Sequence, residues 1–247
     1  MKKAMILAAG LGTRLRPWTL NHPKALVPVG GVPMLERVAE NLRGQGFDSL
    51  LVNVHHFGDQ IIDFISQKGW RDIAISDESD ALLDTGGGIL RAEKYLGVDS
   101  DPFLIHNVDI LSNADLSALM QAHSESGSDC TLLVSDRDSS RKLIFDKNMN
   151  LKGWHSIADN RFRPRRISLQ EGDVELAFSG IHVMSPTVFD EMRRLGLSGK
   201  FPVMDFYLHK DNKLKIMGVK SENLRMLDIG KPNALEEAET FLLNNLD

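Results

Sequence analysis

The chain has 247 residues, with 29 lysines and arginines against 34 aspartates and glutamates, so its formal charge at pH 7 is −5. Apolar residues make up 42% of the chain, which is close to the share in ordinary globular domains and excludes a disordered protein. The acidic balance argues against a general nucleic-acid binder, and no apolar run approaches the ~18–20 residues of a membrane span.

Strand and helix signals alternate through the first two-thirds of the chain. Largely apolar runs predict strands at residues 4–8, 50–54, 73–75, 103–106 and 129–134. Apolar residues at helical spacing predict helices from Pro33 to about residue 44, around 61–65, over 88–96 and over 116–123. Strands that are apolar on both faces and alternate with helices predict an α/β fold with a doubly wound, mostly parallel sheet, which binds ligands outside the carboxyl ends of its strands.

The single cysteine, Cys130, lies in the last of these strands. A lone cysteine excludes intrachain disulfides and cysteine-based zinc sites, and it is typical of a reducing compartment. We therefore expect a cytoplasmic protein in which Cys130 is a buried thiol.

The rhythm changes after about residue 142. A hairpin is predicted over 143–154 with its turn at 146–148, followed by a loop at 160–166 that carries four arginines. A strand at 178–183 and a helix after Pro186 come next. A late strand ends at 228–230, and a closing helix is predicted over 231–243 with Pro232 in its first turn.

A glycine loop follows the first strand directly, in the order Ala8, Ala9, Gly10, Leu11, Gly12, Thr13. Glycines allow backbone N–H groups to close around phosphate oxygens, although an ordinary tight turn would have the same composition. The loop lacks the lysine of a Walker motif and the third glycine of a dinucleotide motif. Arg14 and Lys24 flank it without any need from core packing, and such cations favour a triphosphate site.

Two aspartates, Asp109 and Asp228, stand at the predicted carboxyl ends of strands that are 119 residues apart. Either carboxylate alone is equally consistent with a helix cap. Two carboxylates at the mouth of one sheet suit Mg²⁺, which prefers one or two carboxylates together with phosphate oxygens.

A run of small residues, from Thr85 to Gly88, precedes a predicted helix. One interpretation is a helix entry capped by Thr85. The other is an open backbone surface against which a base and a sugar lie.

Five segments, at 7–29, 83–89, 107–109, 178–181 and 228–232, resemble in order the signature of the nucleotide-sugar pyrophosphorylases, or sugar-1-phosphate nucleotidylyltransferases. The resemblance implies a Rossmann-like fold with a small β-rich insertion, in a single domain. Its nucleotide-binding part would span about 1–135, its sugar-binding part about 136–225, and its closing segment with the metal aspartate and a helix 226–247.

The same resemblance implies an NTP and a sugar 1-phosphate as partners, with Mg²⁺ held by Asp109 and Asp228. It implies catalytic roles for Arg14 and Lys24. It also implies a set of residues that touch the substrates, namely Ala8, Ala9, Gly10, Gly12, Thr13, Gly86, Gly87, Asn107 and Gly180. No general base is expected, because a phosphate monoester loses its second proton near pH ~6 and is already an anion.

The chain departs from the family pattern at several places. Val108 stands where many relatives have glycine, and Leu227 where many have an aromatic residue. The Glu-Lys-Pro segment that holds the sugar phosphate in larger members is missing, so Arg141 is the replacement candidate, against the alternative of a solvated loop charge.

Two further groups of residues have a functional and a plain interpretation. The four loop arginines (Arg161, Arg163, Arg165 and Arg166) could close over an acidic sugar, or form a solvated basic loop. His55 and His56 are adjacent in a strand-like segment, so their side chains point to opposite faces, which argues against a metal pair.

The chain is most similar to the short family members that use UTP and N-acetylmuramate 1-phosphate, and GTP with mannose or heptose 1-phosphate is the alternative. A catalytically silent nucleotide-sugar sensor is a second hypothesis, although a sensor need not keep metal ligands. A phosphocholine acceptor is disfavoured, because only 3 tryptophans and 2 tyrosines are available for a cation cage, beside 11 phenylalanines. We expect no nucleic acid and no membrane as partners, and a monomer or homodimer.

Overall fold

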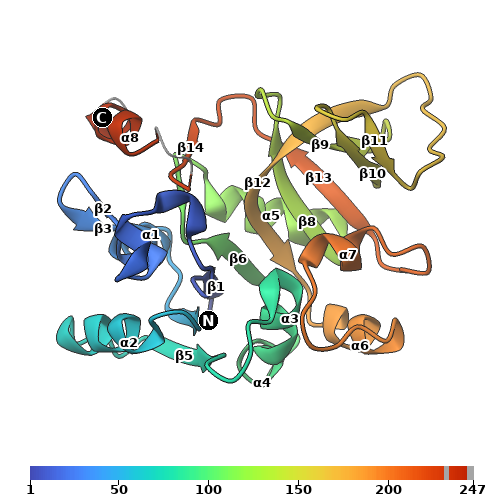
Figure 1. The fold of residues 1–247 in the computed structure, drawn as a ribbon. Helices are drawn as coiled ribbons and strands as arrows, with labels where there is room; N and C mark the ends of the chain where they lie inside the picture. The colour runs from blue at the N-terminus through green and yellow to red at the C-terminus, as the bar shows by residue number, and fades with distance from the viewer. Residues whose placement is uncertain (231–233, 244–247) are drawn as a thin grey trace.

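The computed structural model describes residues 1–230 and 234–243, and within them ten strands form one large sheet (Figure 1). Its centre is parallel, with β1 between β4 and β6 and with β5 beyond β4. β1 is buried on both faces, which is why the residues that follow Lys3 in it are all apolar. The predicted doubly wound α/β fold is therefore confirmed.

The strands of the large sheet are β1 (Lys3–Leu7), β4 (Ser49–Val54), β5 (Ile73–Asp77), β6 (Phe103–Asn107), β8 (Cys130–Ser135), β9 (Arg141–Phe145), β10 (Leu151–Ser156), β11 (Arg161–Arg163), β12 (Val174–Met184) and β13 (Ile216–Lys220). Two short antiparallel ribbons lie outside it. They pair β2 (Pro28–Val29) with β3 (Val32–Pro33), and β7 (Ile110–Ser112) with β14 (Met226–Asp228).

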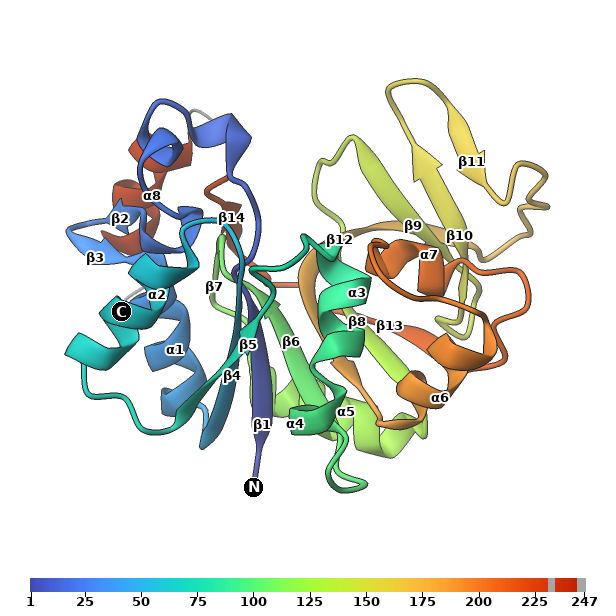
Figure 2. The same ribbon diagram turned by 60° about the horizontal axis from the view of Figure 1, so that its bottom comes forward.

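Helices cover both faces of the large sheet (Figure 2). One face packs against α1 (Met34–Gly44), α2 (Gly58–Gln67) and α5 (Leu116–Ser126). The other packs against α3 (Asp84–Arg91), α4 (Glu93–Leu96), α6 (Thr187–Arg194) and α7 (Val203–Tyr207). The remaining elements are three 3₁₀ turns, η1 (Thr13–Leu15), η2 (Trp18–Leu20) and η3 (Lys24–Leu26), and the helix α8 (Ala234–Leu243). In the part of the chain described, no helix has the length and apolarity to cross a bilayer.

The loops that follow four strands of the large sheet lie at one edge of it, because these strands run in the same direction. β12 runs antiparallel to both β6 and β8, and β13 is parallel to β8. β8 and β13 therefore run in the direction of β1 and β6, and all four strands end at the same edge of the sheet. We call this the carboxyl edge.

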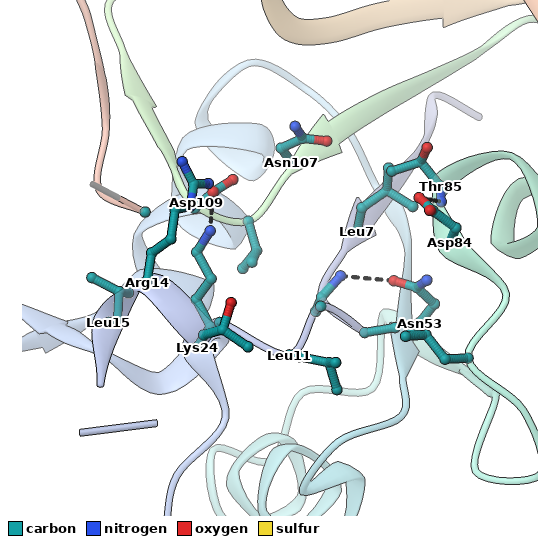
Figure 3. A pocket seen from close by; sticks show the side chains of 18 residues that line it. Leu7, Leu11, Arg14, Leu15, Lys24, Asn53, Asp84, Thr85, Asn107 and Asp109 are labelled. Atoms are coloured by element: carbon teal, nitrogen blue, oxygen red, sulfur yellow. Dashed lines mark hydrogen bonds and ion pairs between the residues drawn. The ribbon is translucent and has the colours of Figure 1, made fainter. Parts of the chain in front are cut away.

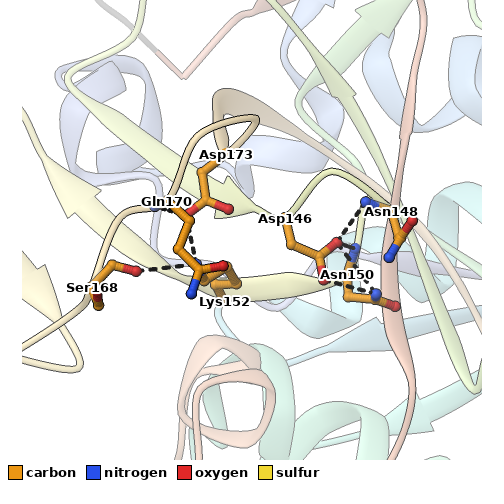
Figure 4. A network of polar contacts seen from close by, with 7 residues as sticks. All are labelled: Asp146, Asn148, Asn150, Lys152, Ser168, Gln170 and Asp173. Atoms are coloured by element: carbon orange, nitrogen blue, oxygen red, sulfur yellow. Dashed lines mark hydrogen bonds and ion pairs between the residues drawn. The ribbon is translucent and has the colours of Figure 1, made fainter.

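The β-rich insertion grows from the first part of β12, which pairs with β9 and leads to β10 and β11. The predicted hairpin is confirmed, and its turn is held by Asp146, whose carboxylate accepts hydrogen bonds from the backbone N–H groups of Asn148 and Asn150 (Figure 4). Lys152 on β10 reaches across to the carboxylate of Asp173, which fixes the segment leading into β12.

Two predicted boundaries are wrong. The helix expected over 88–96 begins at Asp84 and is interrupted at Ala92, giving α3 and α4. It begins early although glycine disfavours helices, because the N–H groups of Gly86 and Gly87 both donate to the carbonyl of Phe201. The predicted loop at 160–166 contains β11, where Phe162 stacks on His155 of β10 with 4.0 Å between ring centroids.

The ribbon of β7 and β14 joins the late strand to the middle of the chain. Asp228 pairs with Ile110, so the residue at the end of β14 lies beside the strand that follows Asp109. The predicted late strand is confirmed, and α8 covers residues 234–243 of the predicted closing helix. Lys231 and Pro232, which the sequence placed in the first turn of that helix, lie outside the described residues.

Candidate active site

A pocket of about 390 Å³ opens at the carboxyl edge (Figure 3). Its lining comes from residues 7–15, Lys24, Asn53, Leu82, Asp84, Thr85, 107–109 and Gly230. Of the residues singled out from the sequence, the pocket brings together Ala8, Ala9, Gly10, Gly12, Thr13, Arg14, Lys24, Asn107 and Asp109. Gly86, Gly87, Arg141, Gly180 and Asp228 are not part of the lining.

The glycine loop depends on Gly12 for its shape. Gly12 has a φ of 62°, in the left-handed region, and a Cβ there would lie 2.9 Å from both Lys24 Cβ and Thr19 Cγ2. The Thr19 hydroxyl donates to the Gly12 carbonyl over 2.8 Å. Only glycine therefore lets the loop approach η3 closely enough to bring Lys24 into the pocket.

Asn53 anchors the other end of the loop. The backbone N–H of Ala8 donates to Asn53 Oδ1 over 2.7 Å, and Asn53 Nδ2 donates to Glu78 Oε1 over 2.7 Å. Glu78 is fully buried, and burial raises the pKa of its carboxyl while the Asn53 amide opposes that rise. Sequence analysis missed both residues, although Asn53 is the one polar residue in the apolar run 50–54.

Four charged groups meet where Gly230 faces the pocket. Lys24 forms an ion pair with Asp109. A Cβ at Gly230 would lie 2.6 Å from Lys24 Nζ, 2.9 Å from Asp228 Oδ1 and 3.0 Å from Arg14 Nη2. The absent side chain thus leaves a point on which these three groups converge.

One backbone hydrogen bond joins the segments that carry the two aspartates, and a local one orients the Asp228 carboxylate. The N–H of Ile229 donates to the Asp109 carbonyl over 3.0 Å, and the N–H of Gly230 donates to Asp228 Oδ1 over 2.9 Å. The structure therefore brings together two carboxylates that are distant in sequence. Their oxygen-only donor set and their number fit Mg²⁺, which takes its other ligands from phosphate and water.

No larger metal-binding cluster occurs among residues 1–230 and 234–243, where no three histidines, cysteines or carboxylates gather. The neighbouring His55 and His56 have separate contacts: His55 Nδ1 lies 2.7 Å from the Glu78 carbonyl, and His56 packs on Phe57.

The run from Thr85 to Gly88 packs against the protein. A Cβ on Gly86 would overlap the Phe201 ring, and one on Gly87 would overlap the Gly199 carbonyl oxygen. The Thr85 hydroxyl accepts from the N–H of Val203 over 2.9 Å, so the interpretation of Thr85 as a helix cap is wrong. The segment lines the pocket with Leu82, Asp84 and Thr85 instead, and contact of Gly86 and Gly87 with base and sugar stays a prediction.

Gly180 and Arg141 lie outside the pocket lining for different reasons. Gly180 has a φ of 76°, and a Cβ there would lie 2.7 Å from Asn107 Nδ2, so Gly180 makes room for a residue that lines the pocket. Arg141 is exposed at the start of β9, and its predicted role stays a prediction. Arg137, which sequence analysis passed over, donates from Nη2 to the Phe178 carbonyl over 2.9 Å.

The chain is similar to known proteins over most of its length. The family model described as "MobA-like NTP transferase domain" matches residues 4–174. The N-acetylmuramate alpha-1-phosphate uridylyltransferase of Caulobacter vibrioides is 30% identical over 98% of this chain and 97% of the relative. The enzyme of the same name from Neisseria meningitidis serogroup B is 32% identical over 97% of both chains.

The solved structure of HddC from Yersinia pseudotuberculosis, complexed with GMP-PN, superposes with a TM-score of 0.75. It is 22% identical, and the match covers 98% of this chain and 100% of that one. At this identity the match shows a shared fold.

Proposed function

The chain belongs to the MobA-like NTP transferase family as a sugar-1-phosphate nucleotidyltransferase, and we propose that its substrates are UTP and N-acetylmuramate 1-phosphate. The observation that carries the proposal at the site is the convergence of Arg14, Lys24 and Asp228 on the point beside Gly230, with Asp109 paired to Lys24. A triphosphate beside the glycine loop would meet both cations there.

In the proposed reaction, an oxygen of the sugar phosphate attacks the α-phosphorus of UTP. The bond from that phosphorus to the bridging oxygen breaks, and the electron pair leaves with pyrophosphate. The attacking phosphate is already an anion at neutral pH, so the chain has no proton to remove. What the chain supplies is position and positive charge.

The backbone N–H groups of the glycine loop and the side chains of Arg14 and Lys24 would supply that positive charge. The N–H groups of the glycine loop would donate to phosphate oxygens, and Asn53 fixes the loop through the Ala8 N–H. Arg14 offers a planar pair of donors and Lys24 a compact charge, which offset the charge that builds on the leaving pyrophosphate.

We propose that Asp109 and Asp228 hold Mg²⁺. When bound, the ion would offset the repulsion between the two anionic substrates. In the structure Lys24 neutralises Asp109, so the carboxylate is not left bare in the pocket.

The proposed substrate pair has support from the two relatives, which carry that activity in their names and match nearly full length. N-acetylmuramate also carries a carboxylate that mannose lacks, and the insertion offers cations. Arg161 pairs with Asp159 and Arg163 with Asp205, while both line a second cavity of about 650 Å³ together with Arg165.

The test is a panel of four NTPs against N-acetylmuramate, mannose, heptose and glucose 1-phosphates, with pyrophosphate release as the readout. We expect UTP with N-acetylmuramate 1-phosphate to give the highest kcat/KM. A preference for GTP, or for mannose 1-phosphate, would overturn this pair and leave the reaction class untouched. Binding of a nucleotide sugar without any pyrophosphate release would favour a sensor.

A further inference from the structure

Arg137 lies at the carboxyl edge but outside the lining of the pocket that contains Arg14 and Lys24. It follows β8 by two residues, and β8 ends at the same edge as β1 and β6. The strand order across the sheet is β1, β6, β12, β8. Arg14 and Lys24 therefore belong to the β1 side, Asp109 follows β6 between, and Arg137 follows β8.

Within the described residues, the Arg137 guanidinium donates hydrogen bonds only to backbone carbonyls and forms no ion pair. Nη2 donates to the Phe178 carbonyl over 2.9 Å and Nη1 to the Asp138 carbonyl over 3.3 Å. Nε is buried and has no hydrogen-bond partner in the described part of the chain, where no carboxylate pairs with this side chain. A desolvated cation that meets only neutral carbonyls is costly, and an anionic ligand would lower that cost.

Two residues of β12 contact the side chains of Arg137 and of the pocket residue Asn107. The register of β12 against β8 shifts between Phe178 and His182, and Gly180 within that shift packs against the Asn107 amide. Phe178, two residues earlier, accepts from Arg137. Irregularities of this kind re-aim side chains next to active sites. Here one short stretch of β12 brings Arg137 and Asn107 to the same place.

Asp228 lies close enough to act on the guanidinium. Burial lowers the pKa of Arg137, and the charge of Asp228 opposes that change. Arg137 is therefore near the carboxylate that belongs to the proposed magnesium site.

We propose that Arg137 binds the phosphate of the sugar 1-phosphate, an inference that rests on the proposed function. Phosphoryl transfer needs the attacking and leaving oxygens on opposite sides of the α-phosphorus. With Arg14 and Lys24 serving the leaving pyrophosphate on the β1 side, the attacking phosphate belongs on the β8 side. A planar guanidinium that has no acidic partner suits a phosphate held through two oxygens.

Steady-state kinetics of Arg137→Gln, Arg137→Lys and Arg141→Gln would test this, with Arg71→Gln as the matched control. Arg71 is exposed and precedes β5, at the opposite edge of the sheet. Losing a hydrogen bond to a charged group weakens binding about 10- to 100-fold. We expect Arg137→Gln to raise KM for the sugar 1-phosphate by at least about tenfold, with KM for UTP within about twofold. Arg137→Lys should recover part of the loss, and Arg71→Gln should match the wild type.

A selective rise in Arg141→Gln with none in Arg137→Gln would give the role to Arg141 and overturn the proposal. Equal rises in both KM values, together with a lower Tm, would make Arg137 a structural link to β12 and also overturn it. If Arg137→Gln does not fold, Arg137→Lys must show the selective rise in a smaller measure. A wild type that releases no pyrophosphate with any substrate pair would overturn the proposed function first, whereas an active wild type with an unaltered Arg137→Gln overturns this inference alone.

Discussion

Asp109 and Asp228 differ in what else they do for the protein. Asp109 is the ion-pair partner of Lys24, and both side chains are largely buried. Asp228 instead accepts from the N–H of Gly230 at the end of β14. The same loss of a carboxylate therefore has different structural costs at the two positions.

We expect Asp228→Asn and Asp109→Asn each to abolish turnover, because both residues are proposed metal ligands and losing one would remove several kcal/mol of transition-state stabilisation. Asp109→Asn should also lower the free energy of unfolding, since Lys24 loses its partner. Asp228→Asn is the cleaner test and should unfold like the wild type in urea. Near-normal kcat at saturating Mg²⁺ would remove that residue from the metal site.

Asn53 is a second position where one side chain serves both stability and the pocket. Asn53→Ala leaves the Ala8 N–H and the Glu78 carboxyl without their partner, and each unsatisfied buried group costs ~1–3 kcal/mol. We expect urea unfolding to show that loss, with a raised KM for the NTP because the glycine loop is no longer fixed. Asn148→Ala, at an exposed turn, is the control and should stay within ~0.5 kcal/mol. An unchanged KM in a destabilised Asn53→Ala would limit Asn53 to a folding role.

The glycine loop and Asp109 could be placed in the pocket because their signals are local: they follow the apolar strands β1 and β6 within a few residues. Asp228 instead ends β14, a half-buried strand outside the large sheet, so only the pairing of β14 with β7 brings it near the pocket. Asn53 gave only the weak signal of a polar residue in an apolar run. Glu78 and Arg137 gave none, because their roles depend on burial and on contacts with β4 and β12 that no local pattern encodes.

Among the elements, α3 makes the strictest demands on residue size. Gly87→Ala would place a methyl group against the Gly199 carbonyl oxygen, and that oxygen cannot move away without shifting the backbone. Overpacking of this kind costs ~1–3 kcal/mol or more. The control is Gly44→Ala at the end of α1, where a Cβ meets nothing within 4 Å and alanine should gain up to ~1 kcal/mol. Equal stability of the two variants by urea unfolding would contradict this packing.

The alternating strands and helices of the first 135 residues were predicted well because each buries a long apolar stretch. The start of α3 was not predicted, since its three glycines are poor helix formers. The N–H groups of Gly86 and Gly87 are nevertheless satisfied by the Phe201 carbonyl. β11 was missed because its charged arginines are typical of an exposed loop. Its pairing with β10 and the stacking of Phe162 on His155 stabilise it as a strand.

For the whole molecule, the clearest consequence of burial is sensitivity to acid. His106 and His182 lie at the centre of the sheet, and burial lowers their pKa values to about 4 and about 3. His182 contacts Tyr207, and His106 faces the Asn107 carbonyl. The unfolded chain binds protons at these histidines below pH ~6.5 while the folded protein does not, so stability falls as the pH drops from about 6.5 toward those values.

We expect the free energy of unfolding in urea to decrease between pH 7 and pH 5, by at most ~1.4 kcal/mol per pH unit for each histidine. Glu78 acts in the opposite sense, because its raised pKa makes the folded protein hold a proton more tightly. Carboxylates with lowered pKa values, such as Glu191 at about 2, lose their contribution mainly below this window. His182→Gln should flatten the pH dependence, and the variant His22→Gln at an exposed position should keep it. An unchanged slope in His182→Gln would show that the buried histidines are not its source.

The fold as a whole brings residues together that local patterns leave apart. The pairing of β14 with β7 sets Asp228 beside Asp109, and the direction of β8 sets Arg137 at the same edge. Sequence patterns placed most strands of the large sheet but not their neighbours. The division into nucleotide-binding and sugar-binding parts stays a prediction, and β13, which falls in the second part, pairs with β8 in the large sheet.

If Asp109 holds Mg²⁺ as proposed, its ion pair with Lys24 should couple the binding of the nucleoside triphosphate to the binding of the metal. A triphosphate that draws Lys24 away releases Asp109 for a divalent cation, so each ligand should raise the affinity for the other by the same factor. Calorimetric titration of Mg²⁺, with and without a non-hydrolysable UTP analogue, would measure that factor. Lys24→Gln should bind Mg²⁺ more tightly when no nucleotide is present and should lose much of the cooperativity. The lysine would then act as a built-in competitor that keeps the enzyme from taking up the metal before its nucleotide arrives.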